Sequence, residues 1–299
     1  MGLDWSPWVP FDAPREYFYI PKAPGVYRIR ATGNEALLTI GETGQSLHKK
    51  ISELRQSLRR ADLMPWSDPH DVAPCLWAYW VEWVTQRNAE GQPEPGDDDE
   101  TPGPVMLECS AAPLDAAAPG RKGMEAYLLY QYRQEAGESP LCSFGRFHPR
   151  YRKSSRRCEN RRGGKLEDHQ QDNPAGFPGI GPLEATGHPG DPGWMGLEWP
   201  EWQSLTADAA RNVPPGAGLY LLADAATREI VYIGHAAAVA ARLMEHQKKA
   251  WDDRELVFSY QITGPVAIPH TLRELETDLI GSFYEQNKKA PEYQYRSSR

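Results

Sequence analysis

The stretch GLYLLADAATREIVYIG at residues 218–234 and the stretch GVYRIRATGNEALLTIG at residues 25–41 are two versions of one pattern. Each opens on a glycine, an apolar residue and a tyrosine, and each closes on isoleucine and glycine. In both, runs of β-branched and aromatic residues flank a centre of turn-forming residues, which is typical of a β-hairpin. If the second hairpin turns near residue 226, Tyr220 and Tyr232 face one another across its two strands.

The similarity extends beyond the hairpins. Residues 2–8 read GLDWSPW and residues 196–202 read GLEWPEW, so this pattern returns about 194 residues later. Glu125 and Glu276 are each followed, three residues on, by two apolar residues. Self-similarity over such a distance indicates two copies of one domain, and it makes each residue that is kept or lost between the copies informative.

The copies define the expected domain organisation. We expect a first unit at residues 1–151, a basic and then Pro/Gly-rich linker at 152–195, and a second unit at 196–299. The linker prediction rests on residues 163–193, where Pro, Gly, His and Asp are too frequent for a segment that buries much apolar surface. In the first unit, residues 86–119 are acidic and rich in Ala, Gly and Pro, which favours a surface insertion.

Composition narrows the class of protein. The 299 residues carry a net charge of −8, with 40% hydrophobic and 25% charged residues, as in ordinary globular proteins. No apolar run approaches the length of a membrane helix, and the first 24 residues carry three acids, so we expect a soluble cytoplasmic protein without a membrane partner. The four cysteines are widely spaced, which favours free thiols over a zinc site or a disulfide framework.

Two helices are expected in the second unit. Val239, Arg242, Leu243 and His246 follow the spacing of one helix face, which sets a cation and an imidazole beside two apolar side chains. A later apolar stripe predicts another helix, and Glu276 falls within that stripe. A carboxylate on an apolar face is costly unless a cation meets it, so Glu276 is a candidate functional residue.

In order along the second unit, these elements are Gly218-Leu219-Tyr220, Tyr232-Ile233-Gly234, Arg242-Leu243-x-x-His246 and Glu276-x-x-Leu279-Ile280. The ordered set resembles the GIY-YIG endonuclease family, whose members include homing endonucleases, certain restriction enzymes and a nuclease subunit of nucleotide excision repair. Each short element is a weak signal by itself, but the set spans nearly the whole second unit. The resemblance implies an α/β (α+β) protein with two GIY-YIG-like units, each a small three-stranded antiparallel sheet flanked by helices.

The resemblance also implies a chemistry for the second unit. A site dependent on Mg²⁺ or Mn²⁺ is expected, with Glu276 as the metal ligand, because Mg²⁺ is commonly held by one carboxylate together with water and phosphate oxygens. Tyr220 is expected next to the attacking water, with Tyr232 hydrogen-bonded in the same site. Arg242 can clamp the scissile phosphate with its forked guanidinium, and His246 can share a proton.

Both units depart from the family pattern in part. Where the family usually has an asparagine, the second unit has Gln294, which we expect to take that role, and the first unit has Ser143. In the first unit Tyr27 and Glu125 match the pattern, whereas Thr39 stands in place of the second tyrosine. The first copy is therefore expected to be degenerate.

The first copy also differs from the second at the positions of Arg242 and His246. With one extra residue allowed in the loop, Lys50 falls at the arginine position and Leu54 at the histidine position, and Arg55 is near enough to replace the lost guanidinium. Lysine is a point charge that cannot form a bidentate phosphate clamp. The candidate second site comprises Tyr27, Lys50, Arg55 and Glu125. The alternative to an impaired first copy is two working sites in an intramolecular pseudo-dimer, each cutting one DNA strand.

A basic run follows the first hairpin unit. Residues 146–165 read RFHPRYRKSSRRCENRRGGK, with Glu159 as the only acid. Such a run predicts phosphate binding, because cations displace counterions condensed on DNA; the alternative is a solvated basic linker. The expected DNA-binding residues are Arg146, Arg150, Arg152, Lys153, Arg156, Arg157, Arg161 and Arg162.

Three functions are compatible with these patterns. We favour a metal-dependent DNA endonuclease of restriction or genome-defence type, with catalysis mainly in the second unit and DNA recognition aided by the first unit and the basic run. The second is a non-catalytic DNA-binding protein on a degenerate nuclease fold. The third is a protein-interaction partner, because the paired tryptophans in residues 2–8 and 196–202 can form a protein-facing surface. We expect those tryptophans to close the domain cores instead.

Overall fold

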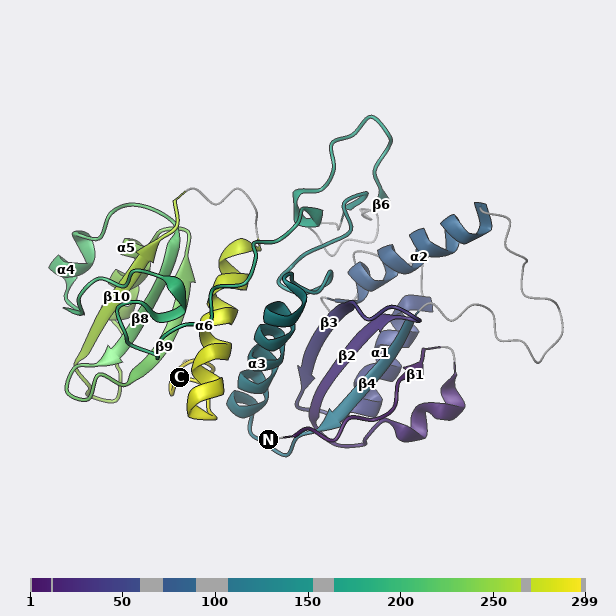
Figure 1. Ribbon diagram of the computed structural model, residues 1–299, viewed down its shortest axis with the longest axis horizontal. Coiled ribbons are helices and arrows are strands. Elements are labelled where there is room, and N and C mark those ends of the chain that lie inside the picture. The colour runs from purple at the N-terminus through teal and green to yellow at the C-terminus, as the bar shows by residue number, and fades with distance from the viewer. Residues whose placement is uncertain are drawn as a thin grey trace. The chain divides into compact units, whose positions relative to one another are not determined.

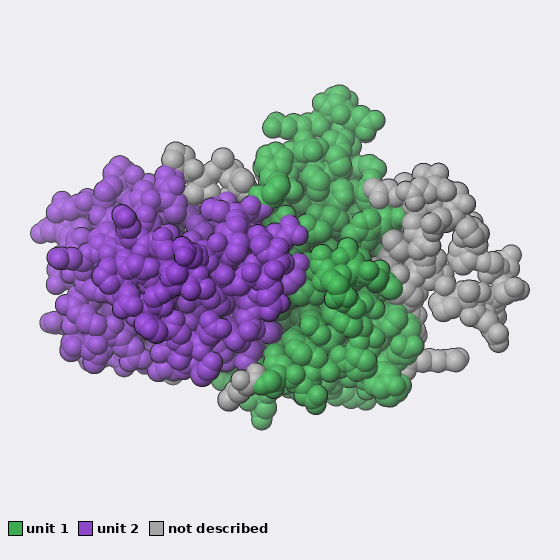
Figure 2. Space-filling view, viewed as in Figure 1, with its two compact units in different colours: residues 1–117, 140–178 green, residues 118–139, 179–299 purple. Residues whose placement is uncertain are grey.

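The computed structural model describes residues 2–11, 13–59, 72–89, 107–152, 164–264 and 270–296. These residues form six α-helices and antiparallel sheets, so the fold is of the α+β class, as predicted (Figure 1). The chain divides into two compact units, the first made of residues 1–117 and 140–178 and the second of residues 118–139 and 179–299 (Figure 2). Among the described helices, none combines the length and apolar character needed to cross a membrane.

The first unit is built on a four-stranded antiparallel sheet with the strand order β1-β4-β2-β3. Its strands are β1 (Val9–Pro10), β2 (Gly25–Ala31), β3 (Leu37–Thr43) and β4 (Leu107–Pro113). Its helices are the 3-10 helix η1 (Pro14–Tyr19), α1 (Leu47–Arg59) and α2 (Ala73–Ala89). A small sheet pairs β5 (Tyr151–Arg152) with β6 (Gly164–Lys165), and the 3-10 helix η2 (Pro174–Gly176) follows. Alternate residues of β2, including Tyr27 and Ile29, share one core with the apolar face of α1.

The second unit repeats this arrangement, with the strand order β7-β10-β8-β9. Its strands are β7 (Gln203–Ser204), β8 (Gly218–Asp224), β9 (Ile230–Ala236) and β10 (Leu256–Ile262). Its helices are α3 (Ala118–Ala136), η3 (Trp194–Gly196), α4 (Ala207–Arg211), α5 (Val239–Gln247) and α6 (Thr271–Asn287). The sheet has a core on each face: Tyr220 and Leu222 pack with α4 and α5, while Leu221 and Ile233 pack with α6 and Trp199.

The two sheets also agree in register. Tyr27 pairs with Gly41 on β3, and Tyr220 pairs with Gly234 on β9. A bulge interrupts each hairpin at the same place, beginning two residues after the tyrosine. The predicted duplication is therefore visible in topology, register and irregularity. The prediction of three strands was one short, because the two-residue strands β1 and β7 extend each sheet by pairing with β4 and β10.

The division into units differs from the predicted boundaries at three places. Residues 118–139, expected in the first unit, belong to the second. Of the expected linker, residues 152–178 belong to the first unit and residues 179–195 to the second. Within the expected insertion, residues 107–113 form β4, which pairs with β1 and β2. Of the remaining residues of that insertion, 86–89 end α2, 118–119 begin α3, and 90–106 lie outside the described part of the chain.

Helices α3 and α6 pack against each other in antiparallel directions. A Cβ atom added to Gly281 would lie 2.1 Å from Cβ of Tyr130, and one added to Gly123 would lie 3.0 Å from the ring of Tyr284. The rings of Tyr127 and Tyr284 stack with their centroids 5.5 Å apart. Glycine is therefore needed where the two helices approach most closely.

The fully buried guanidinium of Arg133 connects residues 179–183 to α3 and α6 by hydrogen bonds. Arg133 donates from Nε to Asp278 over 2.7 Å and from Nη2 to the carbonyl oxygens of Ile180 and Gly181, each over 3.2 Å. The backbone N–H of Ile180 donates to Glu274, and that of Leu183 donates to Asp278. Because these carboxylates satisfy its backbone, this Pro/Gly-rich segment is ordered without burying much apolar surface of its own.

Candidate active site in the second unit

The tyrosine of β8 lies directly over the glycine of β9. A Cβ atom added to Gly234 would lie 2.3 Å from Cζ and Oη of Tyr220. In the first unit, a Cβ added to Gly41 would lie 2.5 Å from the same atoms of Tyr27. The closing glycine of each pattern thus makes room for a phenol that crosses the neighbouring strand.

The expected cross-strand pair of tyrosines is shifted in the structure. Tyr220 is opposite Gly234, and Tyr232 is opposite Leu222. The two rings are diagonal neighbours on the α5 face of the sheet, with centroids 6.1 Å apart and planes 22° apart. The prediction was wrong in register by two residues, because the turn lies slightly later than residue 226 and the bulge between Leu222 and Ala223 shifts the pairing by one residue more.

We expect Gly234→Ala and Gly41→Ala to destabilise their units to a similar degree, by about 1–3 kcal/mol each, because the buried tyrosine ring has nowhere to move. Only Gly234→Ala should also displace Tyr220 from its partners. Chemical denaturation measures the stability of both variants. If Gly41→Ala is destabilised and Gly234→Ala is not, the close approach of Tyr220 to β9 is wrong.

Helix α5 supplies an imidazole to Tyr220. Nε2 of His246 lies 2.8 Å from the Tyr220 hydroxyl, and the His246 side chain is only 1% exposed. Its ring is surrounded by those of Tyr220, Tyr232 and Trp251, with centroids 5.2–5.5 Å away. Burial, followed by the charges of Lys249 and Arg242, lowers the pKa of His246 to about 3. The imidazole is therefore neutral at physiological pH.

This neutral state has a measurable consequence for stability. The pKa of an unfolded histidine is about 6.5, so between that pH and the folded value of about 3 the unfolded chain binds a proton at His246 that the folded chain does not. Acidification across this window should favour unfolding by up to about 1.4 kcal/mol per pH unit from this residue. The free energies of unfolding of wild type and His246→Gln should therefore converge as the pH falls from neutral. A difference between them that is constant with pH would contradict the buried neutral imidazole.

Arg242 comes from the same helix and lies beside both phenols. Its Nη1 is 2.6 Å from Oε2 of Glu245, and its positive charge acts to lower the pKa values of Tyr220 and Tyr232. Burial is the larger effect, so the pKa of Tyr220 is raised well above its ordinary value, with the neighbouring Tyr232 adding to the rise. Both hydroxyl groups thus keep their protons at neutral pH.

Helix α6 brings a carboxylate to the same group. Glu276, whose side chain is 19% exposed, has Oε2 2.9 Å from Nδ1 of His235, although the pair is not aligned as a hydrogen bond. The charge of Glu276 acts on Tyr220 and Tyr232, raising the pKa of both. The phenols, the guanidinium and the imidazole therefore share the α5 face of the sheet, and the carboxylate comes from α6, beside His235, near enough for its charge to act on both phenols.

Sequence reasoning missed His235. The residue directly follows Gly234, and strand alternation turns it to the opposite face from the tyrosines, toward α6. The sequence did contain a sign of this residue. A carboxylate such as Glu276 within an apolar stripe needs a side chain to pair with, and His235 directly follows the second hairpin pattern at residues 218–234.

Gln294 lies at the edge of β9. Its Oε1 accepts from the backbone N–H of Ile233 and its Nε2 donates to the carbonyl of the same residue, both over 2.9 Å. The N–H of Tyr293 donates to the carbonyl of Val231 over 2.9 Å. In this structure the Gln294 amide holds the strand that carries Tyr232, so we assign it a positioning role.

The first unit has the same frame with different side chains. The N–H of Leu47 donates to the carbonyl of Ala23 over 2.9 Å, and the equivalent bond from Val239 to Gly216 is 3.1 Å long. This equivalence places Lys50 where the second unit has its arginine and buried Leu54 where it has its histidine. Tyr27 thus has an apolar side chain at the position that gives Tyr220 its imidazole.

Arg55, a residue of the candidate second site, and Thr39 make other contacts within the first unit. Arg55 lies with Cζ 5.7 Å from the ring centroid of Tyr17, and the Thr39 hydroxyl donates to the carbonyl of Ile40. Glu125 is on α3 and belongs to the second unit, where its charge and that of Glu276 raise the pKa of Tyr295, after burial. Within the second unit, the predicted tyrosines, arginine and histidine are assembled around one hairpin.

Two of the eight predicted DNA-binding side chains are buried or bound within the protein. Arg146 is buried, and Arg150 is taken up by Asp172, over 2.7 Å, and by carbonyl oxygens of residues 166–170. Both were predicted as phosphate-binding side chains and are instead structural. Arg152 is exposed. The remaining five, Lys153, Arg156, Arg157, Arg161 and Arg162, lie outside the described residues.

The donor set fits a hard divalent cation held mainly by water and substrate. Glu276 offers a carboxylate that is partly exposed, and no group of three or more His, Cys, Asp or Glu ligands occurs in the described parts of the chain. Mg²⁺ needs no such cage, because it keeps several waters and binds through one or two carboxylates and phosphate oxygens.

Comparison with models of known protein families, with curated proteins and with solved structures found no match to this chain. The candidate site is therefore described by its own geometry: two stacked phenols, a neutral imidazole, a guanidinium and a carboxylate around one hairpin.

Proposed function

We propose that the protein is a Mg²⁺- or Mn²⁺-dependent DNA endonuclease whose chemistry takes place at the second hairpin. The observation that carries this proposal is the Tyr220 hydroxyl, which lies 2.8 Å from Nε2 of His246 while the charges of Arg242 and Glu276 both act on it. Phosphodiester hydrolysis needs an oriented water and neutralisation of the phosphoryl charge. The residue types in this group can supply both.

The protonation states of Tyr220 and His246 support the proposal that Tyr220 orients the attacking water. Because burial raises its pKa, the hydroxyl is protonated and can donate to Nε2 of the neutral His246. The phenol oxygen also interacts with Arg242, and its remaining lone pair can accept a hydrogen bond from an attacking water that enters this buried site with the substrate. His246 has too low a pKa to be a strong base, so its part is to fix the direction of the Tyr220 O–H bond.

Arg242 and Glu276 have opposite charges and separate parts: Arg242 binds the phosphate of the substrate, and Glu276 holds the divalent cation. The guanidinium is permanently charged and can bind two phosphoryl oxygens at once, once it exchanges the exposed Glu245 for the substrate. Glu276 would hold the divalent cation, with His235 beside it. When bound, such a cation neutralises charge that develops on the phosphoryl group.

A plasmid assay tests the proposal. Purified protein is incubated with supercoiled plasmid, either unmodified or carrying modified bases, in Mg²⁺, in Mn²⁺ or in EDTA. We expect nicked or linear DNA in the presence of a metal and none in EDTA; a preference for one plasmid would support a restriction-type role. Failure to cut either plasmid with either metal would contradict the proposal. If DNA is still bound in EDTA in that case, the protein is a non-catalytic DNA-binding protein instead.

A further inference from the structure

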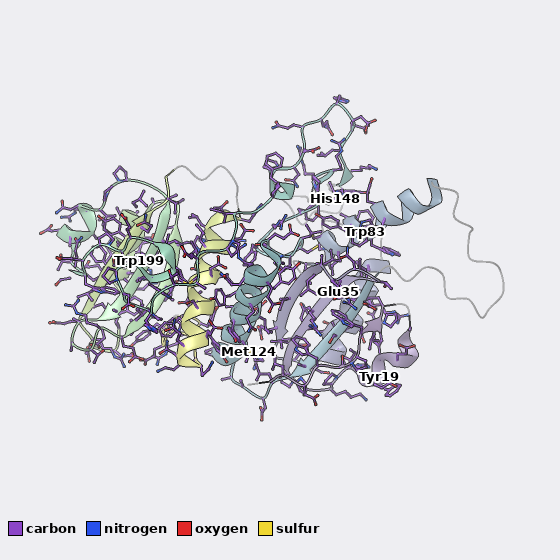
Figure 3. The ribbon with its side chains drawn as sticks, in the orientation of Figure 1. Tyr19, Glu35, Trp83, Met124, His148 and Trp199 are labelled. Carbon is purple, nitrogen blue, oxygen red and sulfur yellow. The ribbon has the colours of Figure 1, made fainter. Side chains whose placement is uncertain are left out.

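The 3-10 helix η1 presents two aromatic side chains to solvent. Phe18 is 72% exposed and Tyr19 is 48% exposed, more than any other large hydrophobic side chain in the described residues. Their rings are tilted by 35° with centroids 3.9 Å apart, and Tyr19 lies on the outer side of η1 (Figure 3). The flanking Tyr17 and Ile20 are buried, so the pair is held between two anchors.

The second copy of the fold has no aromatic residues at the equivalent positions. There α4 precedes β8 as η1 precedes β2, and Ala210 and Val213 are the buried anchors. The two exposed residues between those anchors are Arg211 and Asn212. The first copy thus carries an aromatic pair where the second carries the polar side chains that are ordinary for a solvated surface.

Basic side chains lie against the buried anchor Tyr17 and on the segments next to the aromatic pair in sequence and fold. Tyr17 lies between His48, at 6.2 Å between ring centroids, and Arg55, whose Cζ is 5.7 Å from the ring centroid. Nε of Arg55 is buried and has no hydrogen-bond partner among the described residues. Exposed Lys22 follows η1, and exposed Lys49 is the next residue of α1 after His48.

We propose that Phe18 and Tyr19 stack on a nucleobase of DNA while the neighbouring cations contact its phosphates. Two side chains are too small for a stable protein interface, which needs about 800 Å² from each partner. They are the right size for one base or base step, since aromatic side chains stack on single-stranded bases or wedge between stacked ones. Lys22, Lys49 and Arg55 outnumber the acids Glu16 and Glu53 by one, and Lys49 lies 3.8 Å from Glu53, so a small excess of positive charge remains for a polyanion. This inference rests on the proposed DNA-directed function.

Fluorescence anisotropy with labelled mixed-sequence DNA, single-stranded and duplex, tests the proposal in EDTA, so that cleavage does not contribute. We expect Phe18→Ala and Tyr19→Ala each to weaken binding of one of these DNAs by roughly 5- to 150-fold, the usual effect of removing one stacking partner. The slope of affinity against salt should not change, because stacking releases no counterions. Binding should also quench a 2-aminopurine base in wild type and not in the double variant.

The second copy provides the matched control. Arg211→Ala and Asn212→Ala alter the equivalent exposed positions and should leave 2-aminopurine quenching intact. The Phe18 and Tyr19 variants should retain the wild-type melting temperature, because both side chains are exposed. Wild-type affinity in the double variant would overturn the inference, and a change in self-association instead would identify a protein contact. A protein that cuts DNA but is unaffected by these substitutions would fail this inference alone, whereas a wild type that binds no DNA would fail the proposed function as well.

Discussion

Glu276→Gln is expected to lower the rate of metal-dependent DNA cleavage by about a hundred- to a thousandfold, the usual effect of removing one group that stabilises charge in the transition state. The glutamine keeps the size of the side chain and its place beside His235, but it removes the negative charge that would hold a divalent cation. The initial rate of plasmid nicking in Mg²⁺ measures the effect. The melting temperature should stay close to that of wild type, because the side chain is partly exposed.

Glu285→Gln is the matched control, since it makes the same change on an exposed position of the same helix. We expect it to cleave at the wild-type rate. Cleavage by Glu276→Gln at that same rate would remove Glu276 from the metal site, and loss of activity in both variants would point to a general effect of charge on α6.

Arg133→Met is expected to have the largest effect on stability, a loss of about 3–5 kcal/mol. The guanidinium is fully buried and meets Asp278 over 2.7 Å, the Ser139 hydroxyl and two carbonyl oxygens. Its removal leaves Asp278 and Glu274, both fully buried, without a cation between α3 and α6. Urea denaturation measures the change in the free energy of unfolding.

Two further variants identify the cause of that loss. Arg133→Met/Asp278→Asn should be less unstable than the sum of the single substitutions, because it removes an uncompensated charge as well as its partner. Arg211→Met, which breaks an exposed ion pair with Asp208, should change stability by no more than about 0.5 kcal/mol. Full additivity of Arg133→Met and Asp278→Asn would show that the buried pair is not the source of the stability.

The hairpins could be predicted because the residues that specify each of them lie close together in the sequence. Alternation of apolar residues, a turn-forming centre and a glycine beside a tyrosine all lie within residues 25–41 and 218–234. Features that both copies share could then be attributed to the fold. Pairing registers were less accessible, since the turn lies slightly later than residue 226 and the bulge shifts the pairing by one residue more, which together separate Tyr220 from its expected partner Tyr232.

The unit boundaries could not be predicted because they depend on partners far apart in sequence. Arg133 and Asp278 are 145 positions apart, and this contact helps to place α3 with the second unit. The Pro/Gly-rich segment at 179–183 reads as a linker by composition, yet its N–H groups meet carboxylates of α6. Composition reports how much apolar surface a segment can bury, and it does not report which polar groups it meets.

For the site, residue type and spacing predicted which side chains converge but not the state of each. His246 sits on one helical stripe with Leu243 in the sequence, and that pattern fits a surface histidine equally well. Only the structure shows the ring enclosed by Tyr220 and Trp251, which makes it neutral. In the basic run, Arg150 was predicted to bind phosphate because charge patterning does not reveal an internal partner such as Asp172.

The central claim is that the second copy of the hairpin carries out the chemistry and the first does not. The most direct test compares Tyr220→Phe with Tyr27→Phe in plasmid cleavage with Mg²⁺, because these variants remove the same oxygen from equivalent positions of the two sheets. We predict that Tyr220→Phe cuts about a hundredfold or more slowly than wild type, while Tyr27→Phe cuts at the wild-type rate. Wild-type cleavage by Tyr220→Phe, or loss of cleavage in Tyr27→Phe, would contradict the account.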